Sequence, residues 1–132
     1  LDEISHALPS LLRSSKLKGR AAKAGWEWPD TGMLLDKISE EVGELKAELD
    51  APEHDKQKIG AELGDLLFML VDFGRYHGID AEDALRETNN RFERRFRHME
   101  KRIKEQGKEI KTTPVTERRA LWEEAKRLEK QK

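Results

Sequence analysis

Apolar residues recur at helical spacing along almost the whole chain, and this pattern most narrows what the chain can fold into. One stripe contains Leu34, Leu35, Ile38, Val42, Leu45 and Leu49, and another contains Leu85, Phe92, Phe96, Met99 and Ile103. Such spacing is typical of amphipathic helices, and no segment shows the strict alternation of a half-buried strand. The sequence therefore predicts an all-α fold, a helical bundle of about five helices with a four-helix core.

Residues that start or stop helices divide the chain further. Pro9 suits the first turn of a helix that runs to about Lys23, and Asp30 or Thr31 suits the cap of the next helix, which runs to about Leu49. We expect three further helices, over about 55–77, from a cap at Asp80 to about 107, and over about 116–130. The segment 108–115, which contains Pro114, is predicted to be an extended connection.

Composition restricts the class of protein. The 132 residues suit one domain over 1–132, and the start at Leu1 leads us to expect a domain cut from a longer chain. Charged residues make up 40% and hydrophobic residues 36%, with a net charge of −1. This balance argues against a nucleic-acid binder. The lean apolar fraction is consistent with further burial between subunits.

Disulfides and zinc–thiolate sites are excluded because the chain contains no cysteine. The longest apolar run, Leu66–Val71, is far too short to span a membrane. No signal peptide is visible, so a cytoplasmic location is the default expectation.

Two pairs of acidic residues carry the clearest functional signal. Glu41 and Glu44 lie one turn apart on the second predicted helix, and Glu62 and Asp65 lie one turn apart on the third. Both pairs flank their apolar stripe, so the two flanks can face each other. Four converging carboxylates need a cation, and all-oxygen ligands suit Mg²⁺. Spacing alone leaves open the alternative of solvated glutamates in minor salt bridges.

Basic and aromatic residues on the later helices suit a phosphorylated ligand. Arg91 and Arg95 share one flank of the fourth helix, and guanidinium groups grip phosphate oxygens well. Trp122 and Lys126 lie one turn apart on the last helix, where the indole could stack on a base. Surface arginines and a tryptophan that anchors a terminal helix remain the alternatives.

At these residues the sequence resembles the MazG family of all-helical nucleoside triphosphate pyrophosphohydrolases, in particular the C-terminal domain of its two-domain members. The resemblance rests on four blocks, which begin at Glu40-Glu41-Val42-Gly43-Glu44, Glu62-Leu63-Gly64-Asp65, Asn89-Asn90-Arg91-Phe92 and Trp122-Glu123-Glu124-Ala125-Lys126. The opening segments 4–13 and 25–28 are also similar, so the resemblance spans nearly the whole chain. One departure is Arg91, where the family usually has lysine.

The resemblance implies Mg²⁺ as cofactor, with Mn²⁺ as a substitute, and a homodimer that binds neither nucleic acid nor membrane. It implies metal binding by Glu41, Glu44, Glu62 and Asp65, with Glu41 and Glu62 catalytic. It implies substrate contacts by Lys37, Glu40, Lys58, Arg91, Arg95, Trp122 and Lys126.

The expected reaction is hydrolysis of a nucleoside triphosphate to monophosphate and pyrophosphate, in nucleotide-pool house-cleaning. Glu41 is the candidate to orient or deprotonate the attacking water. The alternatives are a non-catalytic nucleotide- or metal-binding module for dimerisation or regulation, and a plain interaction bundle. The complete set of acidic residues favours the enzyme.

Overall fold

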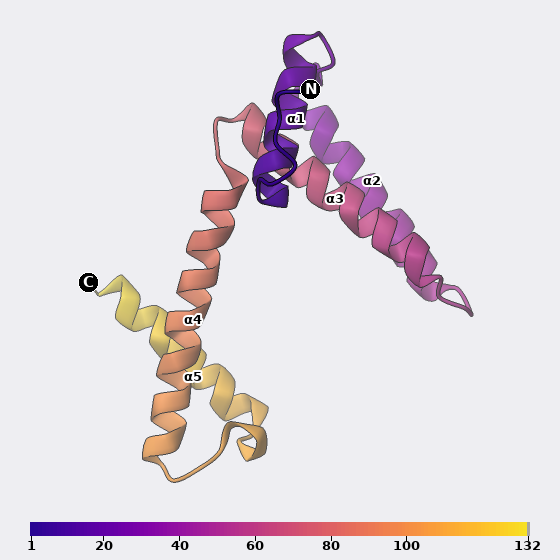
Figure 1. The fold of residues 1–132 in the computed structure, drawn as a ribbon. Coiled ribbons are helices and arrows are strands. Elements are labelled where there is room, and N and C mark those ends of the chain that lie inside the picture. The colour runs from indigo at the N-terminus through magenta and orange to yellow at the C-terminus, as the bar shows by residue number, and fades with distance from the viewer. Residues whose placement is uncertain (132) are drawn as a thin grey trace. The chain divides into compact units, whose positions relative to one another are not determined.

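The computed structural model describes residues 1–131, and in this range it is built from helices (Figure 1). The elements are α1 (Ser10–Lys23), α2 (Thr31–Asp50), α3 (Lys56–Tyr76), α4 (Ala81–Glu105), the short 3₁₀ helix η1 (Ile110–Thr112) and α5 (Val115–Lys130). No strand occurs in this part of the chain, and the all-α prediction is confirmed. Within the same range, no helix combines the length and apolarity needed to cross a membrane.

The helix ends are determined by local capping. Asp30 accepts a hydrogen bond from the backbone N–H of Met33 at 2.9 Å, and Asp80 accepts one from Glu82 at 2.8 Å, as predicted. Gly78, which follows α3, has a φ of +70°, a conformation that ends helices and favours glycine. The prediction for 108–115 was incomplete, because part of this connection winds into η1.

The described chain divides into two compact units. The first unit, Leu1–Ala84, contains α1, α2 and α3, and α3 packs against both other helices. Its buried apolar residues include Ile4, Leu34, Leu66 and Val71. The second unit, Leu85–Lys132, contains most of α4 and α5 around a cluster of Met99, Ile103 and Leu121. A single four-helix core therefore stays a prediction.

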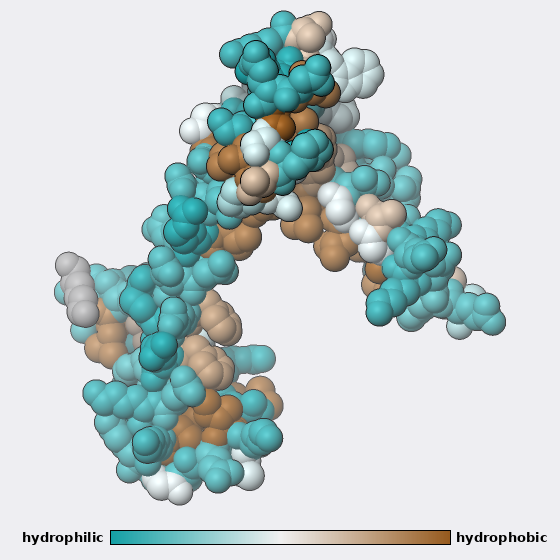
Figure 2. Space-filling model, viewed as in Figure 1, coloured by the Kyte–Doolittle hydropathy of each residue, from teal (hydrophilic) through white to brown (hydrophobic). Residues whose placement is uncertain are grey.

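The predicted apolar stripes are only partly buried in the single chain. On α2, Leu34 is fully buried, whereas Leu35, Val42 and Leu49 are about half exposed. On α3, Leu63, Leu67 and Leu70 are similarly exposed, and Figure 2 shows hydrophobic surface along this helix. Helix α3 covers only one side of α2, so the other side of each stripe meets solvent in the single chain.

Candidate functional site

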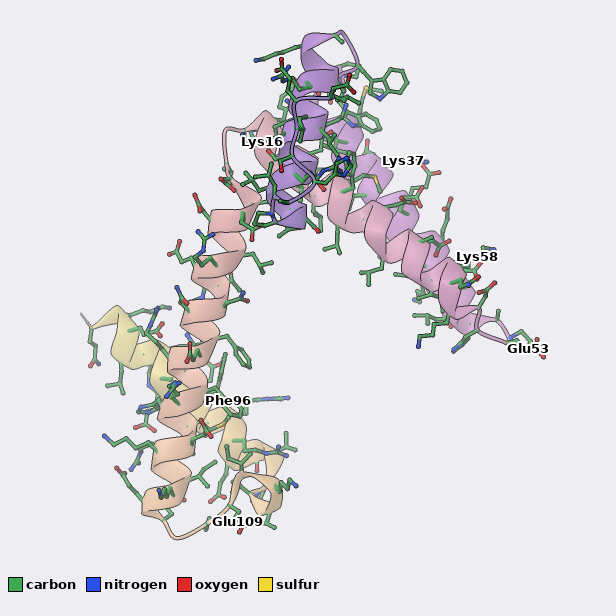
Figure 3. The ribbon with its side chains drawn as sticks, viewed as in Figure 1. Lys16, Lys37, Glu53, Lys58, Phe96 and Glu109 are labelled. Carbon is green, nitrogen blue, oxygen red and sulfur yellow. The ribbon has the colours of Figure 1, made fainter. Side chains whose placement is uncertain are left out.

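The two acidic pairs lie on neighbouring helices of the first unit. Glu41 and Glu44 belong to α2, Glu62 and Asp65 belong to α3, and these helices pack against each other along their length. Glu41 and Glu62 are half-buried, whereas Glu44 and Asp65 are exposed. Lys37 on α2 and Lys58 on α3 lie on the same side of this helix pair (Figure 3).

Lysines already neutralise some of the acids on this surface. The Nζ atom of Lys37 lies 3.3 Å from Glu40 Oε1 and 3.3 Å from Glu41 Oε1. Lys58 reaches from α3 to Glu48 on α2, with an Nζ–Oε1 distance of 2.6 Å. These pairs place Lys37, Glu40 and Lys58, three of the predicted substrate-binding residues, beside the acidic surface.

Electrostatic repulsion marks the acidic pair of α2. The negative charge of Glu41 is the largest influence on Glu44 and raises the pKa of its carboxyl group above the ordinary value. Lys37 opposes this effect but does not cancel it. A bound cation would remove the repulsion, which is the behaviour expected of a metal-binding pair.

The donor atoms fit a hard cation. In α3, the Oε2 atom of Glu62 is buried and has no hydrogen-bond partner among the described residues. A buried carboxylate oxygen without a partner is unfavourable unless an ion or water completes it. No three Asp, Glu or His side chains of residues 1–131 are already gathered around one point that could hold a metal. Metal binding would therefore require the carboxylates to turn toward one another.

In the second unit, the structure brings Arg95 and Trp122 together. The Arg95 guanidinium carbon lies 5.9 Å from the centre of the Trp122 ring, and Phe92 packs 5.5 Å from the same ring. Arg95 also pairs with Glu129 at 3.0 Å. In Figure 3, Phe96 lies where α4 and α5 pack together, and its ring stacks on Phe92 at 5.8 Å. The sequence paired Arg95 with Arg91 and Trp122 with Lys126, so the contact between Arg95 and Trp122 is one that only the structure shows.

The other two predicted contacts of this unit, Arg91 and Lys126, each interact with a residue one turn earlier on their own helix. Arg91 donates to the Thr88 hydroxyl at 3.4 Å, and Lys126 lies 3.9 Å from Glu123 on the same helix. Both side chains are half-buried, and neither interaction would hold them away from a ligand. Their role toward a nucleotide stays a prediction.

Comparison with known proteins identifies the family. The model of the MazG nucleotide pyrophosphohydrolase domain matches residues 31–100, more than half of the chain. This chain belongs to the MazG family. It is 37% identical over 129 residues to the nucleoside triphosphate pyrophosphohydrolase of Escherichia coli K12, covering 98% of the chain and 49% of that relative. It is 33% identical over 126 residues to the nucleoside triphosphate pyrophosphohydrolase/pyrophosphatase MazG of Thermotoga maritima, covering 96% of the chain and 48% of that relative.

The resemblance inferred from the sequence blocks is thereby confirmed at the level of the MazG family. The residues matched by the family model include all four predicted metal ligands, together with Arg91 and Arg95. Trp122 and Lys126 lie beyond them. The chain spans about half the length of the MazG relatives that it matches.

One group of buried charges in this MazG-family chain was missed at the sequence level. Lys18 on α1 and Asp72 on α3 are only 7% and 2% exposed, respectively. The signal was available, because Lys18 follows Leu11 by seven residues and precedes Ala22 by four, which places it on the apolar stripe of its helix. Charged residues at core positions are uncommon and need a partner.

Proposed function

We propose that this chain hydrolyses nucleoside triphosphates, in an Mg²⁺-dependent reaction, to the nucleoside monophosphate and pyrophosphate. The observation that carries the proposal is the pair of acidic flanks on the adjacent helices α2 and α3. One oxygen of this acidic set, Glu62 Oε2, is buried without a hydrogen-bond partner in the described part of the chain. Membership of a pyrophosphohydrolase family supports the reaction class.

Glu41, Glu44, Glu62 and Asp65 would hold Mg²⁺, or Mn²⁺ as a substitute, through their carboxylate oxygens. When bound, the metal would polarise the phosphates and lower the pKa of a coordinated water. Glu41 would orient or deprotonate the water that attacks the α-phosphorus. For this role its carboxylate must turn away from Lys37, its present partner at 3.3 Å.

The cations have a separate role in the proposal, which is to offset negative charge on the substrate and on the pyrophosphate that leaves. Lys58, Arg91 and Arg95 would serve this purpose, since ammonium and guanidinium groups bind phosphate oxygens. Lys37, Glu40, Trp122 and Lys126 would make the remaining contacts with the nucleotide. Each of the lysines and arginines now interacts with a nearby residue of its own unit that a phosphate could replace.

A homodimer is part of the proposal. Leu35, Val42 and Leu49 repeat every seven residues along α2 and are about half exposed. Leu63 and Leu70 form a matching stripe on α3. Helices with such uncovered stripes commonly pack into a four-helix bundle with a second copy. The partner that we propose for this surface is therefore another copy of the chain, and not nucleic acid or a membrane.

The wider role that we propose is nucleotide-pool house-cleaning, in which unwanted triphosphates are converted to monophosphates. The support is the reaction class itself, because release of pyrophosphate removes a triphosphate from use in one step. Measuring pyrophosphate release across the eight common ribo- and deoxyribonucleoside triphosphates would define which ones the chain acts on.

The decisive variant is Glu62→Gln, assayed for pyrophosphate release with Mg²⁺ and a nucleoside triphosphate. Phosphate is measured with and without added inorganic pyrophosphatase, so that pyrophosphate and phosphate release are separated. The substitution keeps the shape of the side chain but removes its charge. Because a bound metal supplies several kcal/mol to such reactions, we expect a loss of about 100-fold or more.

Glu53→Gln is the matched control, since Glu53 is an exposed glutamate in the connection between α2 and α3. It should retain full activity. Circular dichroism should show that both variants keep their helices, and calorimetry should show weaker Mg²⁺ binding only for Glu62→Gln. Unchanged turnover of Glu62→Gln would overturn the metal assignment, and absence of pyrophosphate release by the unmodified chain would overturn the function.

A further inference from the structure

Glu129 lies in the second unit, in the last turn of α5, and has no role in the function proposed above. Its two carboxylate oxygens contact two different arginines of α4. Arg95 Nε donates a hydrogen bond to Oε2 at 3.1 Å, and Arg95 Nη2 lies 3.0 Å from the same oxygen. Arg94 Nε lies 3.7 Å from Oε1. One carboxylate therefore joins the end of α5 to two cations of α4.

We propose that Glu129 is a positioning residue for Arg95, the arginine to which the proposed function assigns contacts with the phosphates of the substrate. The proposal rests on that function and adds to it the group that orients one of its cations. Glu129 acts through the guanidinium and does not contact the substrate. Its carboxylate fixes the plane of the guanidinium before a nucleotide binds, so binding does not have to order this side chain.

Arg95 is held more firmly than its neighbour Arg94. The side chain of Arg95 is 18% exposed, whereas that of Arg94 is 61% exposed. The guanidinium carbon of Arg95 also lies 5.9 Å from the centre of the Trp122 ring. Trp122 and Glu129 are seven residues apart, which places both on the same face of α5. Arg95 thus meets an aromatic ring and a carboxylate from one face of one helix, and the two contacts together restrict its orientation.

The contact with Glu129 leaves part of the guanidinium for a ligand. A guanidinium carries five N–H groups in one plane. The carboxylate meets the edge formed by Nε and Nη2 of Arg95. The two N–H groups of Nη1 lie outside this contact and can donate to phosphate oxygens. A phosphate therefore need not replace Glu129 in order to reach Arg95.

The charges around Glu129 keep its carboxylate ionised and keep the surface attractive to phosphate. The hydrogen bond from Arg95 is the largest influence and, with the charges of Arg95, Arg94 and Arg91, holds the pKa of Glu129 below the ordinary value. Because three guanidinium groups act on one carboxylate, a net positive charge remains for a phosphate. The carboxylate also reduces the mutual repulsion of the arginines, which would otherwise push their side chains apart.

The test measures KM and kcat for pyrophosphate release by Glu129→Gln, with Mg²⁺ and a nucleoside triphosphate. The substitution keeps the shape of the side chain and removes the charge that holds Arg95. We expect KM to rise about 3- to 10-fold, which corresponds to ordering one flexible side chain on binding. We expect kcat to stay within about twofold, because Arg95 is still present. Glu129→Ala, which also removes the hydrogen bond, should raise KM at least as far.

Glu117→Gln is the matched control. Glu117 also lies on α5 and forms an ion pair across to another segment, with an Oε1–Nζ distance of 3.2 Å to Lys108. Neither of these two residues has a role in the proposed function, so this variant should keep the KM of the parent. Circular dichroism and urea unfolding should show that all the variants keep their helices and unfold cooperatively.

Combining the substitution with Arg95→Ala separates a positioning role from a structural one. If Glu129 acts through Arg95, then Glu129→Gln should change the KM of an Arg95→Ala protein by less than about twofold, because no guanidinium remains to be positioned. A structural role of Glu129 in holding α5 against α4 would give the same increase in KM whether or not Arg95 is present.

Three kinds of result would overturn the inference. A KM for Glu129→Gln equal to that of the parent would show that the carboxylate does not position Arg95. A lower KM would show that the carboxylate competes with the phosphate for this arginine. An equal increase in the Arg95→Ala background, or in Glu117→Gln, would show a structural role. In each of these cases the parent still releases pyrophosphate, whereas a parent without pyrophosphate release would refute the proposed function and this inference with it.

Discussion

Glu27 shows how one surface carboxylate can control a loop. The hydrogen bonds from Arg75 are the largest influence on it and hold the pKa of Glu27 below the ordinary value. The backbone N–H of Trp28 and the charges of Arg75 and Lys18 act in the same direction, while Asp72 shares Arg75. Folding therefore favours the ionised form of Glu27. The link from Arg75 on α3 through Glu27 to the backbone of Trp28 depends on that charge.

A pH dependence follows from this lowered pKa. Its contribution to stability is present above the unfolded value of about pH 4.3 and is lost as the pH falls through the lower folded value. We expect Glu27→Gln to be less stable than the parent at pH 7 and about equally stable at about pH 3. Urea unfolding of both proteins at the two pH values measures this difference. A difference in the free energy of unfolding that persists unchanged at low pH would contradict the stabilising role of the Glu27 charge. The control Glu53→Gln should be as stable as the parent at both pH values.

At the scale of helices, short-range capping by aspartates decides where α2, α3 and α4 begin. Asp30, Asp55 and Asp80 each accept hydrogen bonds from backbone N–H groups two or three residues later, at the starts of α2, α3 and α4. These signals are visible in the sequence because they involve neighbouring residues. The beginning of α2 matters most for the proposed function, since this helix carries Glu41 and Glu44, two of the proposed metal ligands.

We expect Asp30→Ala to lower the free energy of unfolding by about 0.5–2 kcal/mol, because the first turn of α2 loses its cap. Asp36→Ala is the control, since Asp36 is an exposed residue inside the same helix. Urea unfolding at one fixed protein concentration compares the variants. Asp30→Ser should recover most of the loss, and an Asp30→Ala protein as stable as the parent would show that the cap contributes nothing.

At the scale of the whole molecule, charge and apolar surface are unevenly distributed. Most Asp and Glu residues lie in 1–84 and most Lys and Arg residues in 85–132, although the net charge is only −1. The first unit also carries the uncovered stripes of α2 and α3, with Leu63 52% exposed. A monomer with this much exposed leucine would be unusual, which supports the proposed homodimer.

Leu63→Glu should therefore shift the chain from dimer to monomer in light scattering coupled to size-exclusion chromatography at micromolar concentration. A charge placed in a buried helix–helix contact is strongly unfavourable without a partner. Val115→Glu, at an exposed apolar residue of the second unit, is the control and should leave the mass unchanged. A parent protein that is monomeric in this measurement would contradict the dimer.

The sequence by itself determined the helical class, most helix boundaries, and the placement of the acidic pairs on two successive helices. These depend on caps within three residues and on helical phase, which are local properties. It also indicated the family, because the four blocks follow one another in order. The roles of the individual site residues remain predictions.

Only the tertiary structure decided which side chains are buried. It showed that Leu35 and Val42 stay half exposed in one chain, and that Lys18 meets Asp72 although they are far apart in the sequence. It also formed a cavity lined by Trp28 and Phe68, which lie on different segments. The physical reason is that burial depends on what packs against a helix face, and periodicity along one helix reports the face but not its partner.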